Sequence, residues 1–162
     1  MKRVLAAALV SVGAAGILFA ASAAGQANPP AWPAGGTAQV FIWADTVTAD
    51  TGKQENFFSQ GSKVVFRAYA VDLKSKKVIT PTQAQYFYVK IPNQPNVRMR
   101  YGPVGAGTAK RSIWTGSWSV PSDYKLGLVD FRVLVHTNDR HHGVFQQAPV
   151  PAAQLTIVAG RP

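Results

Sequence analysis

The sequence predicts an all-β fold, an antiparallel β-sandwich of about seven to eight strands that spans residues 37–160. Apolar and polar residues alternate with a period of two along several short segments, as they do in strands with one buried face. Clusters of Gly, Pro, Asn and Ser separate these segments at spacings typical of antiparallel strands, and no segment shows a helical period. About 135 residues remain after the first 27, a normal size for a single domain, and the segments share no motif at a fixed period. A closed β-barrel is the alternative architecture.

The first 27 residues have the three-part pattern of a secretory signal peptide. Residues 1–3 are Met-Lys-Arg, residues 4–21 are apolar or small, and Ala21-Ser22-Ala23 supplies the small side chains that signal peptidase requires. We expect cleavage after a residue between Ala23 and Ala27, with an uncleaved membrane anchor as the alternative. The protein is then exported, periplasmic or secreted, and meets the membrane only during export. Residues 28–36 are rich in Pro and Gly and predict a linker to the domain.

The strongest strand segments place apolar side chains on one face and charged or polar side chains on the other. In residues 128–137, Asp130 and Arg132 fix which face points outward. The strong segments are 63–72, 85–91, 112–120, 128–137 and 153–158, and the weaker ones are 39–43, 97–101 and 143–147. The side chains predicted to face the core in the strong segments are Val64, Phe66, Ala68, Ala70, Phe87, Val89, Ile91, Trp114, Trp118, Val120, Val129, Phe131, Val133, Val135, Leu155 and Ile157.

Residues 114–135, WTGSWSVPSDYKLGLVDFRVLV, carry a Trp-bearing strand, a Pro-containing turn, a Gly and an alternating strand. This stretch resembles the second half of bacterial immunoglobulin-like domains. In antibody-type domains the second strand carries Gly, Tyr and Cys at alternate positions, which here are Gly127, Val129 and Phe131. The tyrosine corner and the inter-sheet disulfide of that family are therefore missing, and Phe87 or Val89 stands near the place of its core Trp. The resemblance implies an immunoglobulin-like β-sandwich and says little about function.

The chain is basic and has no cysteine. It has 17 Lys and Arg against 7 Asp and Glu, and without Lys2 and Arg3 the excess of positive charge is about eight. The fold must rely on packing instead of disulfides, and its charge favours anionic partners. Because export separates the protein from intracellular nucleic acid, we expect no nucleic acid and favour an acidic envelope protein, with a polyanion or polysaccharide as the alternative. The DLKSKK run at 72–77 predicts a charged turn that promotes solubility.

All three histidines lie close together in the segment VHTNDRHHG, after the strongest strand. Imidazoles and a carboxylate on one loop can hold zinc or copper. The candidate metal ligands are His136, Asp139, His141 and His142. The alternative is a solvated polar loop, because adjacent histidines often diverge and Asn-Asp is ordinary turn chemistry. No other cofactor is expected.

A second candidate site combines tyrosines with cations on the outward phase of two predicted strands. Its members are Arg67, Tyr69, Tyr86, Tyr88 and Lys90. Tyr and Arg are enriched in protein interfaces, and exposed rings also suit a sugar platform. The alternative is that these side chains simply cover a solvated sheet.

The sequence shows no set of residues that would predict an enzyme. Its seven acids are scattered, it has no cysteine, and no serine lies in a nucleophile-elbow pattern. We therefore expect an exported, non-catalytic binding or accessory module that engages a protein partner in the cell envelope. The first alternative is a metal-binding or redox-accessory protein that uses the histidine loop. The second is a carbohydrate-binding module that presents Trp32, Trp43 or the tyrosine face to a sugar.

Overall fold

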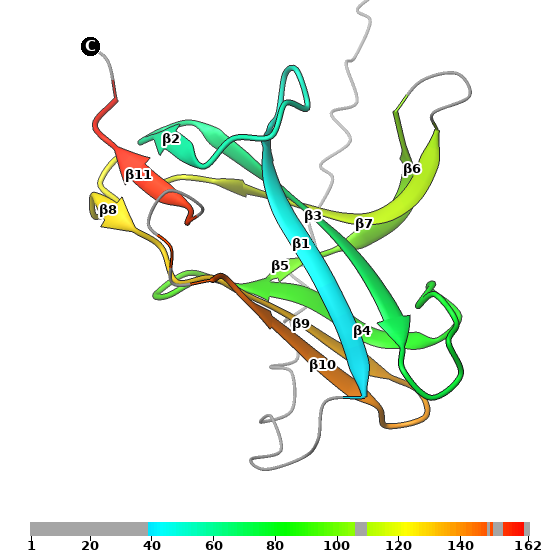
Figure 1. Cartoon of the computed structure of the whole chain (residues 1–162). Helices are drawn as coiled ribbons and strands as arrows, with labels where there is room; N and C mark the ends of the chain where they lie inside the picture. Colours follow the sequence, from blue (N-terminus) through cyan, green and yellow to red (C-terminus); the bar gives the residue numbers. More distant parts are fainter. Residues whose placement is uncertain (1–38, 106–109, 149, 151–153, 161–162) are drawn as a thin grey trace, which may run out of the picture. The chain divides into compact units, whose positions relative to one another are not determined.

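The computed structural model describes residues 39–105, 110–148, 150 and 154–160 (Figure 1). The predicted signal peptide and linker, with Trp32, lie outside these residues. The described part consists of strands, turns and irregular segments and contains no helix that could span a membrane. The prediction of an all-β fold is confirmed.

Eleven strands form in the described residues, more than the sequence suggested, because several of them are short. They are β1 (Val40–Thr48), β2 (Phe57–Ser59), β3 (Lys63–Asp72), β4 (Ala84–Lys90), β5 (Val97–Arg98), β6 (Arg100–Val104), β7 (Arg111–Ser119), β8 (Gly127–Leu128), β9 (Arg132–Thr137), β10 (His142–Gln146) and β11 (Thr156–Val158).

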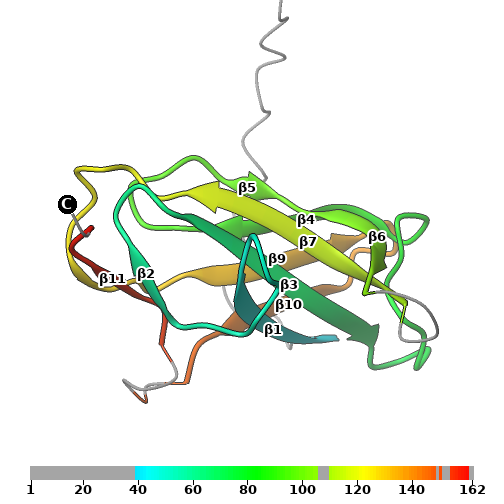
Figure 2. The same cartoon turned by 90° about the horizontal axis from the view of Figure 1, so that it is seen from above.

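The strands build three sheets (Figures 1 and 2). The β3 sheet has the order β1-β3-β7-β6 and the β4 sheet has the order β10-β9-β4-β5, and both are antiparallel throughout. A small third sheet, with the order β2-β11-β8, pairs β2 and β11 in parallel.

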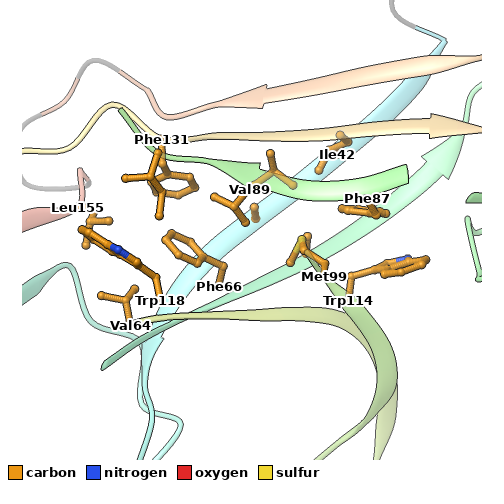
Figure 3. Packing of buried hydrophobic residues seen from close by; sticks show 14 of the residues in the cluster. Ile42, Val64, Phe66, Phe87, Val89, Met99, Trp114, Trp118, Phe131 and Leu155 are labelled. Atoms are coloured by element: carbon orange, nitrogen blue, oxygen red, sulfur yellow. The ribbon is translucent and has the colours of Figure 1, made fainter. Parts of the chain in front are cut away.

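The β3 sheet and the β4 sheet enclose one hydrophobic core (Figure 3). The ring of Phe87 on β4 stacks on that of Trp114 on β7, with centroids 4.5 Å apart. Phe66 on β3 meets Phe131, just before β9, edge to face at 4.9 Å. Every side chain that the alternation predicted to face the core is buried. The arrangement is compatible with the predicted β-sandwich.

Two segments predicted as single strands are each divided between sheets. In the segment 97–101 the chain changes sheet at Met99, because β5 pairs with β4 whereas β6 pairs with β7. In the segment 128–137, β8 pairs with β11 whereas β9 pairs with β4. The alternation is uninterrupted across both changes, since the side chains of Met99, Val129 and Phe131 stay buried in the common core.

At one edge, β1 lies close against β10. The backbone N–H of Gln39 donates to the carbonyl of His142 at 3.0 Å. A Cβ atom built on Gly143 would lie 2.4 Å from the carbonyl oxygen of Val40, closer than a real Cβ can approach. Glycine at 143 therefore permits β1 to approach β10. The predicted weak strand at 39–43 continues to Thr48.

Candidate functional site

The five residues predicted as one binding face lie on two different sheets. Arg67 and Tyr69 belong to β3, whereas Tyr86, Tyr88 and Lys90 belong to β4. Because the inner faces of the two sheets share the core, their outer faces point away from each other. The prediction of a single continuous face is therefore corrected: the connection between β3 and β4 crosses from one sheet to the other.

On the β3 sheet, Tyr69 lies beside two exposed aromatic side chains of β1. Trp43 is its direct cross-strand partner, and Phe41 follows two residues away on the same face. The exposed fractions are 57% for Phe41, 48% for Trp43 and 38% for Tyr69. We call these three residues the aromatic face. Three large aromatic side chains are therefore exposed next to one another on neighbouring strands.

An ion pair lies next to the aromatic face on the same two strands. The Arg67 guanidinium donates from Nε to Asp45 Oδ1 at 2.8 Å and from a second nitrogen to Asp45 Oδ2. Asp45 is buried and Arg67 is partly buried. Hydrogen bonding to Asp45 raises the pKa of Arg67 above its ordinary value. The pair neutralises Arg67 and holds its planar group in place beside Tyr69.

On the β4 sheet, the two tyrosines cover their neighbours. Tyr88 is only partly exposed and lies between its cross-strand partners Arg98 and Leu134. Leu134 takes the outward phase of β9 and is nevertheless buried, so adjacent side chains must cover it. Burial also raises the pKa of the Tyr88 hydroxyl.

Tyr86 is likewise packed against its own sheet. Its ring lies 6.4 Å from that of His136, its cross-strand partner on β9. Lys90 is exposed and lies opposite Arg132. On this sheet Tyr86 and Tyr88 are therefore partly exposed and lie against neighbouring side chains of the sheet.

The structure brings two of the three histidines together and turns the third away. His136 and His142 are cross-strand partners on β9 and β10. Burial, and to a smaller extent the charge of His142, lowers the pKa of His136, whose Nδ1 lies 2.9 Å from Gln85 Oε1. His141 instead contacts Asp72, and Asp139 is exposed on the turn. Across the described residues, no three His, Cys, Asp or Glu side chains gather closely enough to hold a metal ion.

Asp72 is a buried carboxylate that links two connections of the fold. It accepts hydrogen bonds from the backbone N–H of Ser75 at 2.6 Å, from the Ser75 hydroxyl at 2.9 Å and from Nδ1 of His141. The Ser75 amide and His141 hold the pKa of Asp72 well below its ordinary value. Because the Ser75 hydroxyl donates to Asp72 and not to His141, the three side chains are not arranged as a nucleophile with its base.

Phe41, Asp45 and Asp72 were not identified as site residues from the sequence. Residues 40–44 are all apolar, so no alternation with polar residues indicates which of their side chains face outward. A weak signal for the outward face was available. Phe41 and Trp43 share their face of the strand with the polar residues Gln39 and Asp45, which alternate with the apolar positions between them. Asp72 had no comparable signal, because its partner His141 is 69 residues away in the chain.

Comparison with known proteins gives no relative: no protein-family model, no curated protein and no solved structure matches this chain. The geometry of the chain is therefore the basis for any proposal about its function.

Proposed function

We propose that this chain is an exported, non-catalytic binding module of the immunoglobulin-like type, and that its aromatic face engages an acidic protein partner in the cell envelope. The N-terminal sequence pattern supports export. The exposed rings of Phe41, Trp43 and Tyr69 are the observation that carries the binding role.

The strand order supports the immunoglobulin-like type. In such sandwiches, strands lettered in chain order lie as A-B-E-D in one sheet and G-F-C in the other. If β1, β3, β4, β6, β7, β9 and β10 are lettered A to G in chain order, the β3 sheet reads A-B-E-D and the β4 sheet reads G-F-C. β5 then adds a strand beside C, as in the variable-type variants of the fold.

The composition of the aromatic face suits a protein partner. Trp, Tyr and Arg are the residues enriched at the energetic centre of protein interfaces. Trp43 and Tyr69 present rings at adjoining positions, and Arg67 is already paired with Asp45, so its guanidinium needs no further partner to remain ordered. A partner that places apolar side chains on the rings would bury surface that the free protein leaves exposed.

The acidic character of the partner follows from the charges around the aromatic face. Arg67 is neutralised, but Arg100 on β6 and Arg111 on β7 are exposed on the same sheet. The chain as a whole has 17 Lys and Arg against 7 Asp and Glu. A partner with carboxylates at the rim of its contact surface would gain in association rate from this charge.

Affinity capture tests the proposal. The tagged chain is expected to retain an acidic protein in fixed ratio from its native envelope extract, through washes at low and then high salt, because salt screens exposed charges more than a packed apolar contact. Replacement of Trp43 and Tyr69 by Ser should lower the affinity by about thirtyfold or more. The matched control replaces Tyr86 and Tyr88 by Ser and should retain the partner. Equal loss in both variants, or no retained partner, contradicts the proposal.

A carbohydrate ligand is the second candidate for the same face, because Trp43 and Tyr69 lie side by side with exposed rings. Such a pair can stack on a sugar ring. A titration against envelope polysaccharides separates the candidates: saturable binding that is lost with Trp43 favours the sugar, whereas a flat titration leaves the protein partner.

A further inference from the structure

Three connections of the fold bring cations to one end of the two large sheets. The β3–β4 turn carries Lys74, Lys76 and Lys77, the β9–β10 turn carries Arg140, and Lys110 and Arg111 lie where β7 begins. All six are exposed. Figures 1 and 2 both show the β3–β4 connection and the β9–β10 turn at the same end of the sheets. We call these six residues the basic end.

Hydrogen bonds within the fold hold the two turns together. Asp72, at the start of the β3–β4 turn, contacts His141, at the end of the β9–β10 turn. Asp72 also exchanges backbone hydrogen bonds within its own turn, donating to Lys77 and accepting from Lys76. These contacts hold the turn that carries the lysines against the turn that carries Arg140.

The basic end has few acids beside its cations, whereas the other end of the sheets has nearly as many acids as cations. Near the basic end, Asp72 is buried and already bonded, which leaves Asp139 as the exposed acid of the two turns. At the other end, the exposed or partly exposed acids Asp50, Glu55, Asp123 and Asp130 accompany the exposed cations Lys53, Lys63, Lys90, Lys125 and Arg132. The exposed cations therefore exceed the exposed acids most strongly at the basic end.

We propose that the basic end docks on the surface of an anionic lipid bilayer. Lysine is a flexible point charge with three rotatable donors, which suits a broad field of headgroups better than one fixed anion. Leu73, at the head of the lysine-bearing turn, is 44% exposed and adds an apolar side chain where it could enter the headgroup layer. An acidic protein would instead be matched by a surface that combines aromatic rings with arginines, such as the aromatic face with Arg100 on the same sheet.

This docking goes beyond the proposed binding function and beyond the expectation that the protein meets the membrane only during export. It uses none of the three residues of the aromatic face and shares only Arg111 with the charges around that face. Because the variants that test each proposal leave Arg111 unchanged, the two proposals are tested separately.

Vesicle binding of the full-length chain tests the inference. The probes are vesicles of phosphatidylglycerol and phosphatidylcholine in equal parts, and vesicles of phosphatidylcholine alone, at about 0.1 M salt. The turn variant is Lys74→Gln, Lys76→Asn and Lys77→Gln; Asn is chosen at 76 because Lys76 has a φ of 59°, a conformation that Asn tolerates. The control variant, Lys53→Gln, Lys63→Gln and Lys125→Gln, removes the same charge from the other end.

The wild-type chain should bind the anionic vesicles more tightly than the neutral ones. Binding to the neutral vesicles measures the contribution of the apolar N-terminal segment, which all variants share. The turn variant should bind the anionic vesicles about a hundredfold more weakly than the wild type. The control should change by about threefold or less, because β3 alone, with ten residues, spans about 33 Å, well beyond the screening length. Leu73→Ser should weaken binding about tenfold.

Equal weakening by the turn and control variants would overturn the inference, since net charge alone would then explain binding. Wild-type binding to both vesicle types at the same strength would also overturn it. A third contrary result is a turn variant that binds vesicles normally and loses affinity for soluble polyglutamate, because the basic end would then serve an acidic polypeptide.

Discussion

The outer faces of the two large sheets carry the same kinds of residue and use them differently. On the β4 sheet, Tyr88 is partly buried beside the buried Leu134, and Tyr86 packs near His136. On the β3 sheet, Phe41 and Trp43 remain about half exposed although they lie beside another aromatic side chain. An outward-facing position on a strand therefore does not determine whether an aromatic side chain packs against its own sheet or stays exposed. The side chains on the neighbouring strands determine this.

Gly143→Ala should have the largest effect on stability, because it disrupts the contact between β10 and β1, the strand that carries Phe41 and Trp43. The new Cβ would lie 2.4 Å from the backbone oxygen of Val40, which a flexible side chain cannot relieve. We expect the free energy of unfolding in denaturant to fall by about 3 kcal/mol. Gly102→Ala is the control, since a Cβ there meets nothing within 4 Å, and it should change stability by about 0.5 kcal/mol or less. Equal effects of the two substitutions would contradict the close approach of β1 to β10.

Asp72→Asn should have the next largest effect and should change the pH dependence of stability. It weakens the bonds to Ser75 and His141 and should cost about 2 kcal/mol at neutral pH. Because folding lowers the pKa of Asp72, its stabilising contribution is present above about pH 4 and is lost as the pH falls toward the folded pKa.

Urea titrations at a series of pH values measure this contribution. The wild type should lose more stability below about pH 4 than the variant does. Asp139→Asn, on the neighbouring exposed turn, is the control for charge removal. If the variant loses as much stability below about pH 4 as the wild type does, the Asp72 carboxylate is not held as described.

Tyr88→Ser should affect stability moderately and partner binding not at all. The ring covers part of its own sheet, and its loss would expose Leu134, so we expect a cost of about 1–2 kcal/mol in thermal or chemical unfolding. A loss of partner capture at unchanged stability would reverse the roles assigned to the two faces.

Trp43→Ser should have the smallest effect on stability, about 0.5 kcal/mol or less, because roughly half of the side chain is already in water. The same variant should show the clearest loss of binding. A large loss of stability would make Trp43 part of the fold's own packing and remove it from the contact surface.

Most of the core could be predicted from the sequence, because alternation with charged residues identifies the inner face of each strong strand. The predicted positions in β3, β4, β7 and β9 are all buried. The changes of sheet at Met99 and near Val129 could not be predicted, since the alternation is the same whether a strand continues or changes partner. β2 was missed because it has three residues and its pairing partner β11 lies far away in the chain.

The candidate site was only partly predictable for a related reason. Arg67 and Tyr69 were identified by their phase, but their neighbours Asp45 and Trp43 depend on the pairing of β1 with β3. The same phase argument joined Tyr69 to Tyr86, although the two lie on opposite outer faces. The histidines show the limit most clearly. Their proximity in the sequence allowed either a shared metal ligand or a solvated polar loop, and it did not indicate that His141 contacts Asp72 while His136 lies opposite His142.

Site-specific photo-crosslinking in the producing cells tests the central claim most directly. A benzophenone amino acid is placed at Trp43 in one variant and at Tyr86 in another, and the covalent products are compared after irradiation. The account predicts one abundant product with an acidic envelope protein from position 43 and none from position 86. The same product from both positions, or a product from position 86 alone, would contradict the assignment of the aromatic face as the contact surface.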